Sequence, residues 1–569
     1  MNKLPNLPPI PPNFKENSEE LLSNSSSILS IFPRIFRAFP TYNRGNRLYR
    51  AGRYEAAIAY YDKAISQKPD WDKAWLKRGR TLEKLQCYEE AITAYQKVIE
   101  IKPNDYWAWI YLGRLLYQMQ RYENALNCYE KIINLKPNKP ESWYDYGMVL
   151  EKLQRYKETI YCYKQALLIQ PEWYEVWCQL GNVLKKINNY EEAVKALDKA
   201  LKFKQDSWQI WLNRGIALDA IEKYQEAVES FDRALNLKPN DAKIWINCGI
   251  SLEKLQKYTD AVAAYDKAIQ LNPDAAEAWF YRGMALKHKW YEAAIASFDK
   301  AIEINPQWAV AWWGRGVALS EAGYHEDAII AFDKAIEINT EYPDAWLGRG
   351  AALYQLRSYD KAILAFSNAI QLKSDFPEAW NNRGEALEQL QRYNEAITAY
   401  QKVIQLRSND NFWAYRAWMK CGSVFEKMQR YEDAVNAYDQ AINIESNNSD
   451  PWLKKGQALE KLEQYQLAAV AYNKAIEIQP DNAKAWIKRA QAPEKAQSFA
   501  EALTVYDRII QLQPHSYDAW VKRGLLLEKM QRYQEALRSY GVAIELKPDC
   551  YEAIENRKWL ESQLGLTNE

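Results

Sequence analysis

The stretch AWLKRGRTLEKLQCYEEAITAYQKVIEIKP, residues 74–103, decides the fold class of this chain. Its second half places Ile92, Tyr95 and Val98 at the spacing of one helix face, and Pro103 ends the run. Its first half, AWLKRGRTLEKL, has apolar residues at a helical spacing of its own. The stretch therefore predicts two consecutive helices joined by a short turn, which is a helical hairpin.

The same pattern recurs along the chain with a period of 34 residues, interrupted by one step of 33 and one of 38. Gly follows the recurring Trp by four positions, except where Ala490 replaces it. A fixed period of this length indicates a repeat architecture in which each unit packs on its neighbours. The Trp residues of the pattern are Trp75, Trp109, Trp143, Trp177, Trp211, Trp245, Trp279, Trp312, Trp346, Trp380, Trp418, Trp452, Trp486 and Trp520.

Trp, Gly, aromatic, Ala and Pro at this spacing resemble the tetratricopeptide repeat, and the resemblance covers residues 38–550. Units such as TYNRGNRLYRAGRYEAAIAYYDKAI, residues 41–65, look like the long repeat proteins common in cyanobacteria. The resemblance implies an all-α fold, a right-handed superhelical α-solenoid of about fifteen 34-residue helix-turn-helix units. Residues 551–569 resemble the solvating C-terminal helix of the family.

The recurring glycine and tryptophan both suit close packing. Gly79 weakens its helix by roughly 0.5–1 kcal/mol relative to Ala, so its recurrence indicates that something approaches the backbone there. The second helix of the same hairpin is the expected neighbour, with Ala91 on the facing side. Trp brings 150–250 Å² of surface to the seam between units, so we expect the recurring Trp to be a packing residue.

Three interruptions break the period. One residue is missing from ALKHKWYEAAI, residues 285–295, which predicts a shortened first helix. Four extra residues between Ser408 and Trp418 predict a wider gap, and a bend, between two units. Pro493 lies inside a first helix, where it costs about 3 kcal/mol if unrelieved, so we expect a kink or an unravelled turn.

The N-terminal region lies outside the repeats. Residues 1–27 are rich in Pro and Ser and are expected to be disordered. Residues 28–37 have apolar residues near helical spacing and are expected to form a short amphipathic cap on the first unit. Two alternatives are an autoinhibitory segment that fills the groove and a membrane-surface contact through residues 28–39.

Composition excludes several classes of protein. Lys and Arg number 75 against 74 Asp and Glu, so net charge gives no support to nucleic-acid binding. No apolar run approaches the roughly 18 residues of a membrane helix, and the N-terminus lacks the apolar core of a signal peptide. The seven Cys form no CxxC pair, and Cys128 and Cys162 are repeat-equivalent. These features predict a soluble cytoplasmic protein.

The chain shows no motif for catalysis. Its three His residues are His288, His325 and His515, and none has a ligand partner at metal-site spacing. Neither a nucleotide-binding glycine loop nor a hydrolase motif is present. We therefore expect no enzymatic activity, no cofactor and no metal. Recurring Glu-Lys pairs, such as Glu460-Lys461, are expected to be solvated surface.

The resemblance implies that the first helices line a concave groove. It also implies that this groove is faced by the side chains at positions two, five, six, nine, twelve and thirteen of each unit. Aromatic and Met side chains on such a face suit the docking of a peptide or a helix; packing within the stack is the alternative. The apolar candidates of the third and fourth units are Trp107, Ile110, Tyr111, Tyr117, Tyr144 and Met148. Those of the eighth to tenth units are Phe280, Tyr281, Met284, Trp313, Val317, Leu347 and Tyr354.

The family's best-known ligand mode is a carboxylate clamp of Lys and Asn in one unit, Asn in the next, and Lys and Arg in the third. The closest match in this chain is Asn182, Asn213 and Lys243. Cys178 replaces the first Lys and Asn247 replaces the last Arg, so two of the five elements are missing. This departure argues against a clamp for a chaperone tail.

Together these observations predict a non-enzymatic scaffold that binds partner proteins or peptides in its groove. Its expected use is the assembly or regulation of a multiprotein complex. One alternative is a targeting or adaptor subunit for an enzyme on a separate chain. A second is a membrane-surface organiser that uses residues 28–39.

Overall fold

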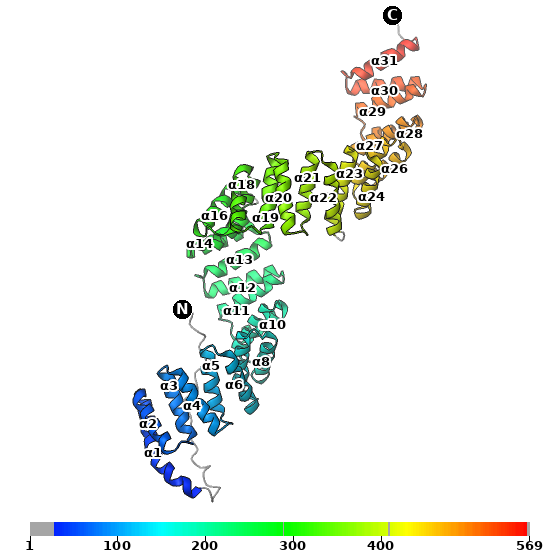
Figure 1. Ribbon diagram of the computed structural model, residues 1–569. Coiled ribbons are helices and arrows are strands. Elements are labelled where there is room, and N and C mark those ends of the chain that lie inside the picture. Colours follow the sequence, from blue (N-terminus) through cyan, green and yellow to red (C-terminus); the bar gives the residue numbers. More distant parts are fainter. Residues whose placement is uncertain (1–27, 288, 408–409, 566–569) are drawn as a thin grey trace. The chain divides into compact units, whose positions relative to one another are not determined.

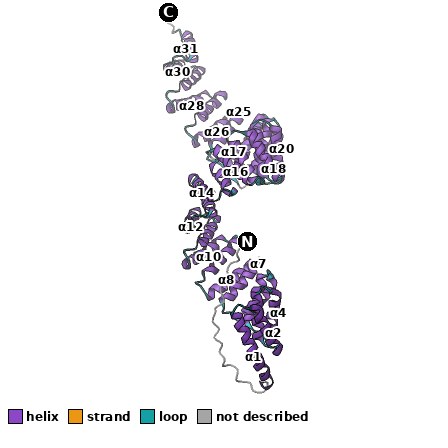
Figure 2. Cartoon of the chain, turned by 90° about the vertical axis from the view of Figure 1, so that its left-hand side faces the viewer, coloured by secondary structure: helices purple, strands orange, loops and turns teal. Residues whose placement is uncertain are grey.

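The computed structural model describes residues 28–287, 289–407 and 410–565, and every regular element in them is an α-helix (Figures 1 and 2). The chain divides into two compact units between Asn272 and Pro273. The first unit contains α1 (Ile28–Arg50), α2 (Tyr54–Gln67), α3 (Asp72–Lys84), α4 (Tyr88–Ile101), α5 (Tyr106–Gln118), α6 (Tyr122–Leu135), α7 (Pro140–Lys152), α8 (Tyr156–Ile169), α9 (Tyr174–Lys186), α10 (Tyr190–Phe203), α11 (Trp208–Ala220), α12 (Tyr224–Leu237), α13 (Ala242–Lys254) and α14 (Tyr258–Leu271).

The second unit continues the alternation of first and second helices. It contains α15 (Ala276–Leu286), α16 (Tyr291–Ile304), α17 (Ala309–Glu321), α18 (His325–Ile338), α19 (Pro343–Gln355), α20 (Tyr359–Leu372), α21 (Pro377–Gln389), α22 (Tyr393–Leu406), α23 (Asn411–Lys427), α24 (Tyr431–Ile444), α25 (Ser449–Lys461), α26 (Tyr465–Ile478), α27 (Ala483–Lys495), α28 (Phe499–Leu512), α29 (Tyr517–Lys529), α30 (Tyr533–Leu546) and α31 (Tyr551–Gln563). The predicted all-α stack of helical hairpins is confirmed.

Most turns inside a hairpin place one residue at positive φ. In the α3–α4 turn, Gln86 has a φ of 63°, and the Cys87 N–H donates to the Leu82 carbonyl at 3.0 Å. This bond satisfies a carbonyl at the end of α3. Two hairpins place a glycine, Gly52 or Gly323, at the corresponding turn, with φ of 73° and 88°. The second helix begins two residues after the turn residue.

The recurring glycine lies under an aromatic ring of the second helix. A Cβ at Gly79 would stand 2.6 Å from Cε1 of Tyr95, far closer than real Cβ contacts. Tyr95 is fully buried, and its hydroxyl donates to Glu83 Oε2 at 2.8 Å. The predicted close approach is confirmed, and the tyrosine ring is the group that needs the space.

The recurring tryptophan bonds most of the first helices to the loop before them. Trp75 Nε1 donates to the carbonyl of Pro69 at 2.8 Å, six residues earlier. The indole is half-buried, so the rest of the ring packs at the seam between hairpins. These contacts confirm its packing role. The same bond recurs at Trp109, Trp143, Trp177, Trp211, Trp245, Trp279, Trp312, Trp346, Trp380, Trp486 and Trp520.

Two of the three interruptions change the length of a first helix. Helix α15 has 11 residues instead of 13, as predicted for the one-residue deletion. The four extra residues do not open a gap, because they extend α23 to 17 residues. Asp410 caps this longer helix by accepting from the Phe412 N–H at 3.1 Å and the Trp413 N–H at 3.4 Å. The predicted gap is therefore wrong.

The third interruption leaves its helix intact. Helix α27 has 13 residues and runs through Pro493, whose side chain is buried. The Pro493 carbonyl accepts from the Ser498 N–H at 2.7 Å, the same bond that closes other first helices. The predicted unravelled turn is wrong, because the proline lies in the last turn of a helix already held by its neighbours.

The two ends of the described chain are helical. Helix α1 runs without a break from Ile28 to Arg50, so the segment 28–37 continues into the first repeat. Residues 1–27 and the side chains of residues 28–37 lie outside the described part of the chain. The roles expected for them therefore stay predictions. Helix α31 packs through Ala553 and Leu560. None of the described helices combines the length and the apolar content needed to cross a bilayer.

Candidate functional site

The residues predicted to bind partners lie at equivalent positions of successive first helices. We call the side of the hairpins that carries positions two, five, six, nine, twelve and thirteen of each first helix the first-helix face. In the first compact unit the apolar candidates come from α5 and α7. In the second they come from α15, α17 and α19.

Two candidates of the first group belong to the core. Ile110 and Tyr111 are only 5% and 7% exposed, so they have little surface to offer a partner. They are buried because position five and six side chains of α5 pack between neighbouring hairpins, in the same cluster as Tyr95. The half-buried candidates of this group are Trp107, Tyr117, Tyr144 and Met148.

An aromatic stack leads from this core to the surface. The rings of Tyr95 and Tyr111 stack with centroids 5.7 Å apart. Trp107 stacks in turn on Tyr111 at 6.2 Å. The guanidinium of Arg80 lies 5.1 Å from the centre of the Tyr111 ring. Trp107 is thus a half-buried indole held by rigid neighbours, which is the kind of anchor that a protein interface uses.

A buried ion pair joins the two first helices of this group, and the sequence analysis missed it. Arg114 of α5 donates to Asp145 of α7 at 3.1 Å, and the Asp145 side chain is only 2% exposed. Burial raises the pKa of Asp145, and the arginine opposes that shift. The pair fixes the register of α5 against α7, between the half-buried aromatic residues.

The second group has one core residue and six half-buried ones. Phe280 is 7% exposed and packs on Phe298 and Trp308, with ring centroids 5.7 and 4.9 Å away. It is a packing residue because a ring of α16 and the indole just before α17 cover it. Trp313 lies 6.2 Å from the ring of Tyr342 and keeps part of its surface exposed. The half-buried candidates are Tyr281, Met284, Trp313, Val317, Leu347 and Tyr354.

The three clamp-like asparagines bond to other groups of the chain. Asn213 accepts a hydrogen bond from Lys185 Nζ at 2.6 Å, and Asn182 Nδ2 lies 3.9 Å from Cys178 Sγ. Asn247 turns back to donate to the backbone carbonyl of its own helix at 2.7 Å, from residue 243. Lys185, which the sequence did not single out, supplies a cation close to Cys178, where the clamp pattern lacks a lysine.

The environment of Lys185 changes its acidity. Burial lowers the pKa of its ammonium to about 8 from the ordinary 10.5, Cys178 opposes that shift, and the positive charge of Lys243 adds to it. A lysine with such a pKa has a substantial neutral fraction near pH 8. A larger share of this amine than of an ordinary lysine is therefore in the neutral form that acylating reagents attack.

Competitive acylation should detect this lysine. With trace acetic anhydride and peptide mass spectrometry, we expect the pH midpoint for labelling of Lys185 to fall near 8. Replacing Asn213 with alanine should lower the midpoint further, because the amide oxygen stabilises the charged amine. A midpoint near 10.5 in the native protein would contradict the burial of this side chain.

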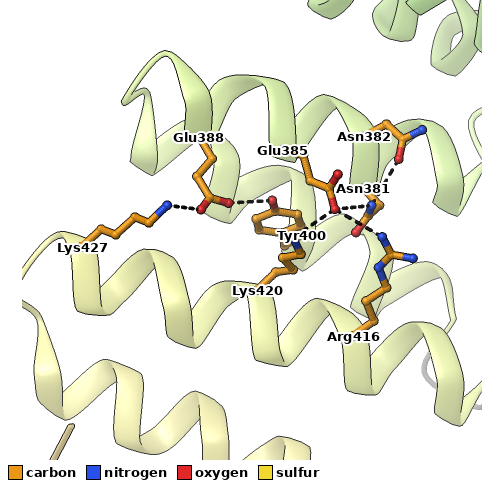
Figure 3. A network of polar contacts seen from close by, with 8 residues as sticks. All are labelled: Asn381, Asn382, Glu385, Glu388, Tyr400, Arg416, Lys420 and Lys427. Carbon is orange, nitrogen blue, oxygen red and sulfur yellow. Dashed lines mark hydrogen bonds and ion pairs between the residues drawn. The ribbon is translucent and has the colours of Figure 1, made fainter. Parts of the chain in front are cut away.

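Polar residues of the first-helix face also tie α21 to α23, as Figure 3 shows. Glu385 accepts from Asn381 Nδ2 at 3.2 Å and pairs with Arg416 at 3.3 Å and Lys420 at 3.1 Å.

Glu388, one turn further along α21, makes a second set of contacts. Its carboxylate accepts from the Tyr400 hydroxyl of α22 and from the Lys427 ammonium of α23. The face is therefore crossed by bonds between hairpins.

The carboxylates of the Glu-Lys pairs are structural rather than simply solvated, which corrects the expectation from the sequence. Glu460 is only 8% exposed and pairs with Lys495 at 3.1 Å. Glu528 accepts from the hydroxyl of the buried Tyr540 at 3.0 Å. The glutamate side chains at position twelve thus contact the second helix of their own hairpin or the first helix of the next hairpin.

The chain is similar to several solved structures. It matches the APC/C hetero-tetramer Cut9-Hcn1 with 17% identity over 82% of this chain and 98% of that chain, at a TM-score of 0.34. Yeast Tom70 matches with 17% identity over 82% of this chain and 99% of that one, at 0.36. YrrB, described as a TPR protein with an unusual peptide-binding site, matches with 27% identity over 32% and 95%, at 0.29.

Family profiles give the assignment. The profile of anaphase-promoting complex, cyclosome, subunit 3 matches residues 118–200. The search of curated proteins gave no match. Profiles of the tetratricopeptide repeat match residues 42–106, 85–145, 178–242, 249–309, 291–345, 353–391, 377–410, 422–463, 449–482 and 489–560. Since these matches cover well over half of the chain and the helices pair as hairpins throughout, the chain belongs to the tetratricopeptide-repeat family.

Proposed function

We propose that this protein is a non-enzymatic scaffold that binds partner proteins or peptides on its first-helix face. We further propose that it assists the assembly or regulation of a multiprotein complex. The observation that carries the proposal is the group of half-buried aromatic and Met side chains at equivalent positions of neighbouring first helices.

These side chains have the properties of interface anchors. Aromatic residues dominate binding energy when they stand on rigid supports and can be fully buried by a partner. Trp107 rests on the Tyr95–Tyr111 stack, and Trp313 lies beside Tyr342. Such anchors need little ordering when a partner binds, so most of the buried area is available as affinity.

The use in a multiprotein complex rests on a separate observation. Residues 118–200 match the profile of a subunit of the anaphase-promoting complex. This range contains Tyr144 and Met148, two of the half-buried candidates. The likeness supports a role in assembly over a role as a simple chaperone cofactor, and it names no partner for this chain.

Affinity capture from an extract of the source cell tests the proposal. We expect Trp107→Ala or Trp313→Ala to remove at least one protein that the wild type captures, because each deletes a central anchor. Tyr161→Ala and Tyr324→Ala are matched controls, since these tyrosines are 57% and 52% exposed on other parts of the hairpins. The controls should keep the full set of captured proteins.

Quantitative mass spectrometry compares the captured sets, and circular dichroism confirms that each variant is folded. If both Trp variants are folded and capture the same proteins in the same amounts as wild type, the first-helix face is not the binding surface. Turnover of a substrate by the purified chain alone would contradict the non-enzymatic part of the proposal.

A further inference from the structure

A cavity of about 310 Å³ lies between α27, α28 and α29. It stands at the lower end of the roughly 300–1,000 Å³ range of small-ligand sites. Its apolar lining comes from three successive helices and the loop that precedes α29. The lining residues that matter for the argument are Trp486, Ile487, Tyr506, Ile509, Leu512 and Ser516.

At three equivalent junctions of the chain, an aromatic side chain of the connecting loop packs against the residue that corresponds to Ile487. Trp71, the residue just before α3, lies 4.7 Å from the ring of Tyr42. Trp173, just before α9, lies 5.1 Å from Tyr144. At a third junction, the rings of residues 308 and 280 are 4.9 Å apart.

The residue in this place before α29 is Ser516. Its side chain is too small to reach Ile487, so the space that an indole fills at those three junctions is part of the cavity here. Ile487 is 41% exposed, and Leu512 is 46% exposed. The cavity therefore has room for an aromatic side chain, at the place where those three junctions carry one.

The charges at the cavity add a second preference. Two carboxylates, Asp481 and Asp518, belong to the lining, and no basic side chain does among the described residues that line it. The lysines at position six of α27 and α29 are directed to other partners, Lys488 to Glu460 at 3.6 Å and Lys522 to Glu552 at 3.4 Å. A positive charge beside the cavity would thus meet carboxylates.

We propose that this cavity binds an aromatic side chain, the size of tryptophan, presented by a partner segment with basic residues beside it. The aromatic ring would take the place that Trp71 and Trp173 occupy at their own junctions. The adjacent cations would pair with Asp481 and Asp518. This inference rests on the proposed scaffold function and names the chemistry of one partner site.

Three probe peptides test the proposal on the full chain. They are acetyl-Gly-Lys-Trp-Lys-Gly-amide, the same peptide with Ala for Trp, and the same peptide with Glu for both Lys. Saturation-transfer NMR titrations at low salt should give a dissociation constant for the first peptide at least tenfold lower than for the Ala peptide. It should also be several-fold lower than for the Glu peptide.

Variants locate the site. Ser516→Trp should fill the cavity and weaken binding of the Lys-Trp-Lys peptide at least tenfold, whereas Ser516→Ala should leave it unchanged. Asp481→Asn combined with Asp518→Asn should abolish the preference over the Glu peptide. Because both carboxylates are exposed, this double variant keeps the test open even if Ser516→Trp fails to fold.

Equal binding of the Trp and Ala peptides, unchanged binding to folded Ser516→Trp, or an unchanged charge preference in the double Asn variant would each overturn the inference. These results would leave the scaffold proposal standing, because capture that depends on Trp107 and Trp313 is measured separately. If capture did not depend on Trp107 or Trp313 but the Lys-Trp-Lys peptide still bound, the proposal for the first-helix face would be wrong and the inference about the cavity would stand.

Discussion

Replacing Tyr163 with alanine should destabilise the hairpin of α7 and α8 by about 3–5 kcal/mol, the usual cost of removing a fully buried aromatic side chain. Tyr163 has no exposed surface, and its ring covers Gly147, where a Cβ would stand 2.5 Å from Cε1. Its hydroxyl donates to Glu151 at 3.1 Å, and that carboxylate also pairs with Lys186 at 2.7 Å.

Hydrogen exchange measured by mass spectrometry is the appropriate readout, because a stack of repeats need not unfold in one step. Amides of α7 and α8 should exchange at least a hundredfold faster in Tyr163→Ala than in wild type. The control Tyr163→Phe keeps the ring and should cost only about 1 kcal/mol, the value of one hydrogen bond. Equal exchange in the two variants would show that the ring does not support the hairpin.

Replacing Asp145 with leucine should cost about 3 kcal/mol, because it leaves the guanidinium of Arg114 partly buried without its counter-charge. The Arg114 side chain is 18% exposed, so some water reaches it and the cost falls at the low end of the range for broken buried pairs. Exchange of the amides in α5 and α7 gives the measurement.

The double variant Arg114→Met with Asp145→Leu is the control for this prediction. Removing both charges removes the desolvation cost of both, so the double variant should be more stable than Asp145→Leu alone. If the single variant were as stable as wild type, water would reach the pair in solution and the burial described for Asp145 would be wrong.

The hairpins could be predicted from the sequence because each one repeats the same few contacts. Gly79 and Tyr95 stand 16 residues apart in sequence and touch in the structure, and the same pair of residue types recurs in most units. Local signals for the interruptions were also present. Asp410 followed by NFWAYRAW is a capped helical pattern, so the longer α23 could have been found from the sequence.

The candidate site was harder to predict, because a family position does not determine burial. Tyr144 and Phe280 occupy the same position in their units, but only the phenylalanine is fully covered. The missed ion pairs did have a signal. Arg114 with Asp145, and Glu385 with Arg416, are opposite charges 31 residues apart, which places them on adjacent first helices. The cavity beside Ser516 was not predicted, because the sequence does not show that the space next to this small side chain stays unfilled.

The contact between one carboxylate and the lysine of the following hairpin sets a rule for how this chain can change in length. Glu151 and Lys186, Glu460 and Lys495, and the pair at residues 494 and 529 are all separated by 35 residues. Removing the hairpin of α27 and α28, for example, would bring Lys529 in front of Glu460 in place of Lys495. Whole hairpins whose first helices carry this lysine can therefore be lost or duplicated while the seam keeps its bond, whereas smaller insertions must be absorbed within a single helix, as in α23.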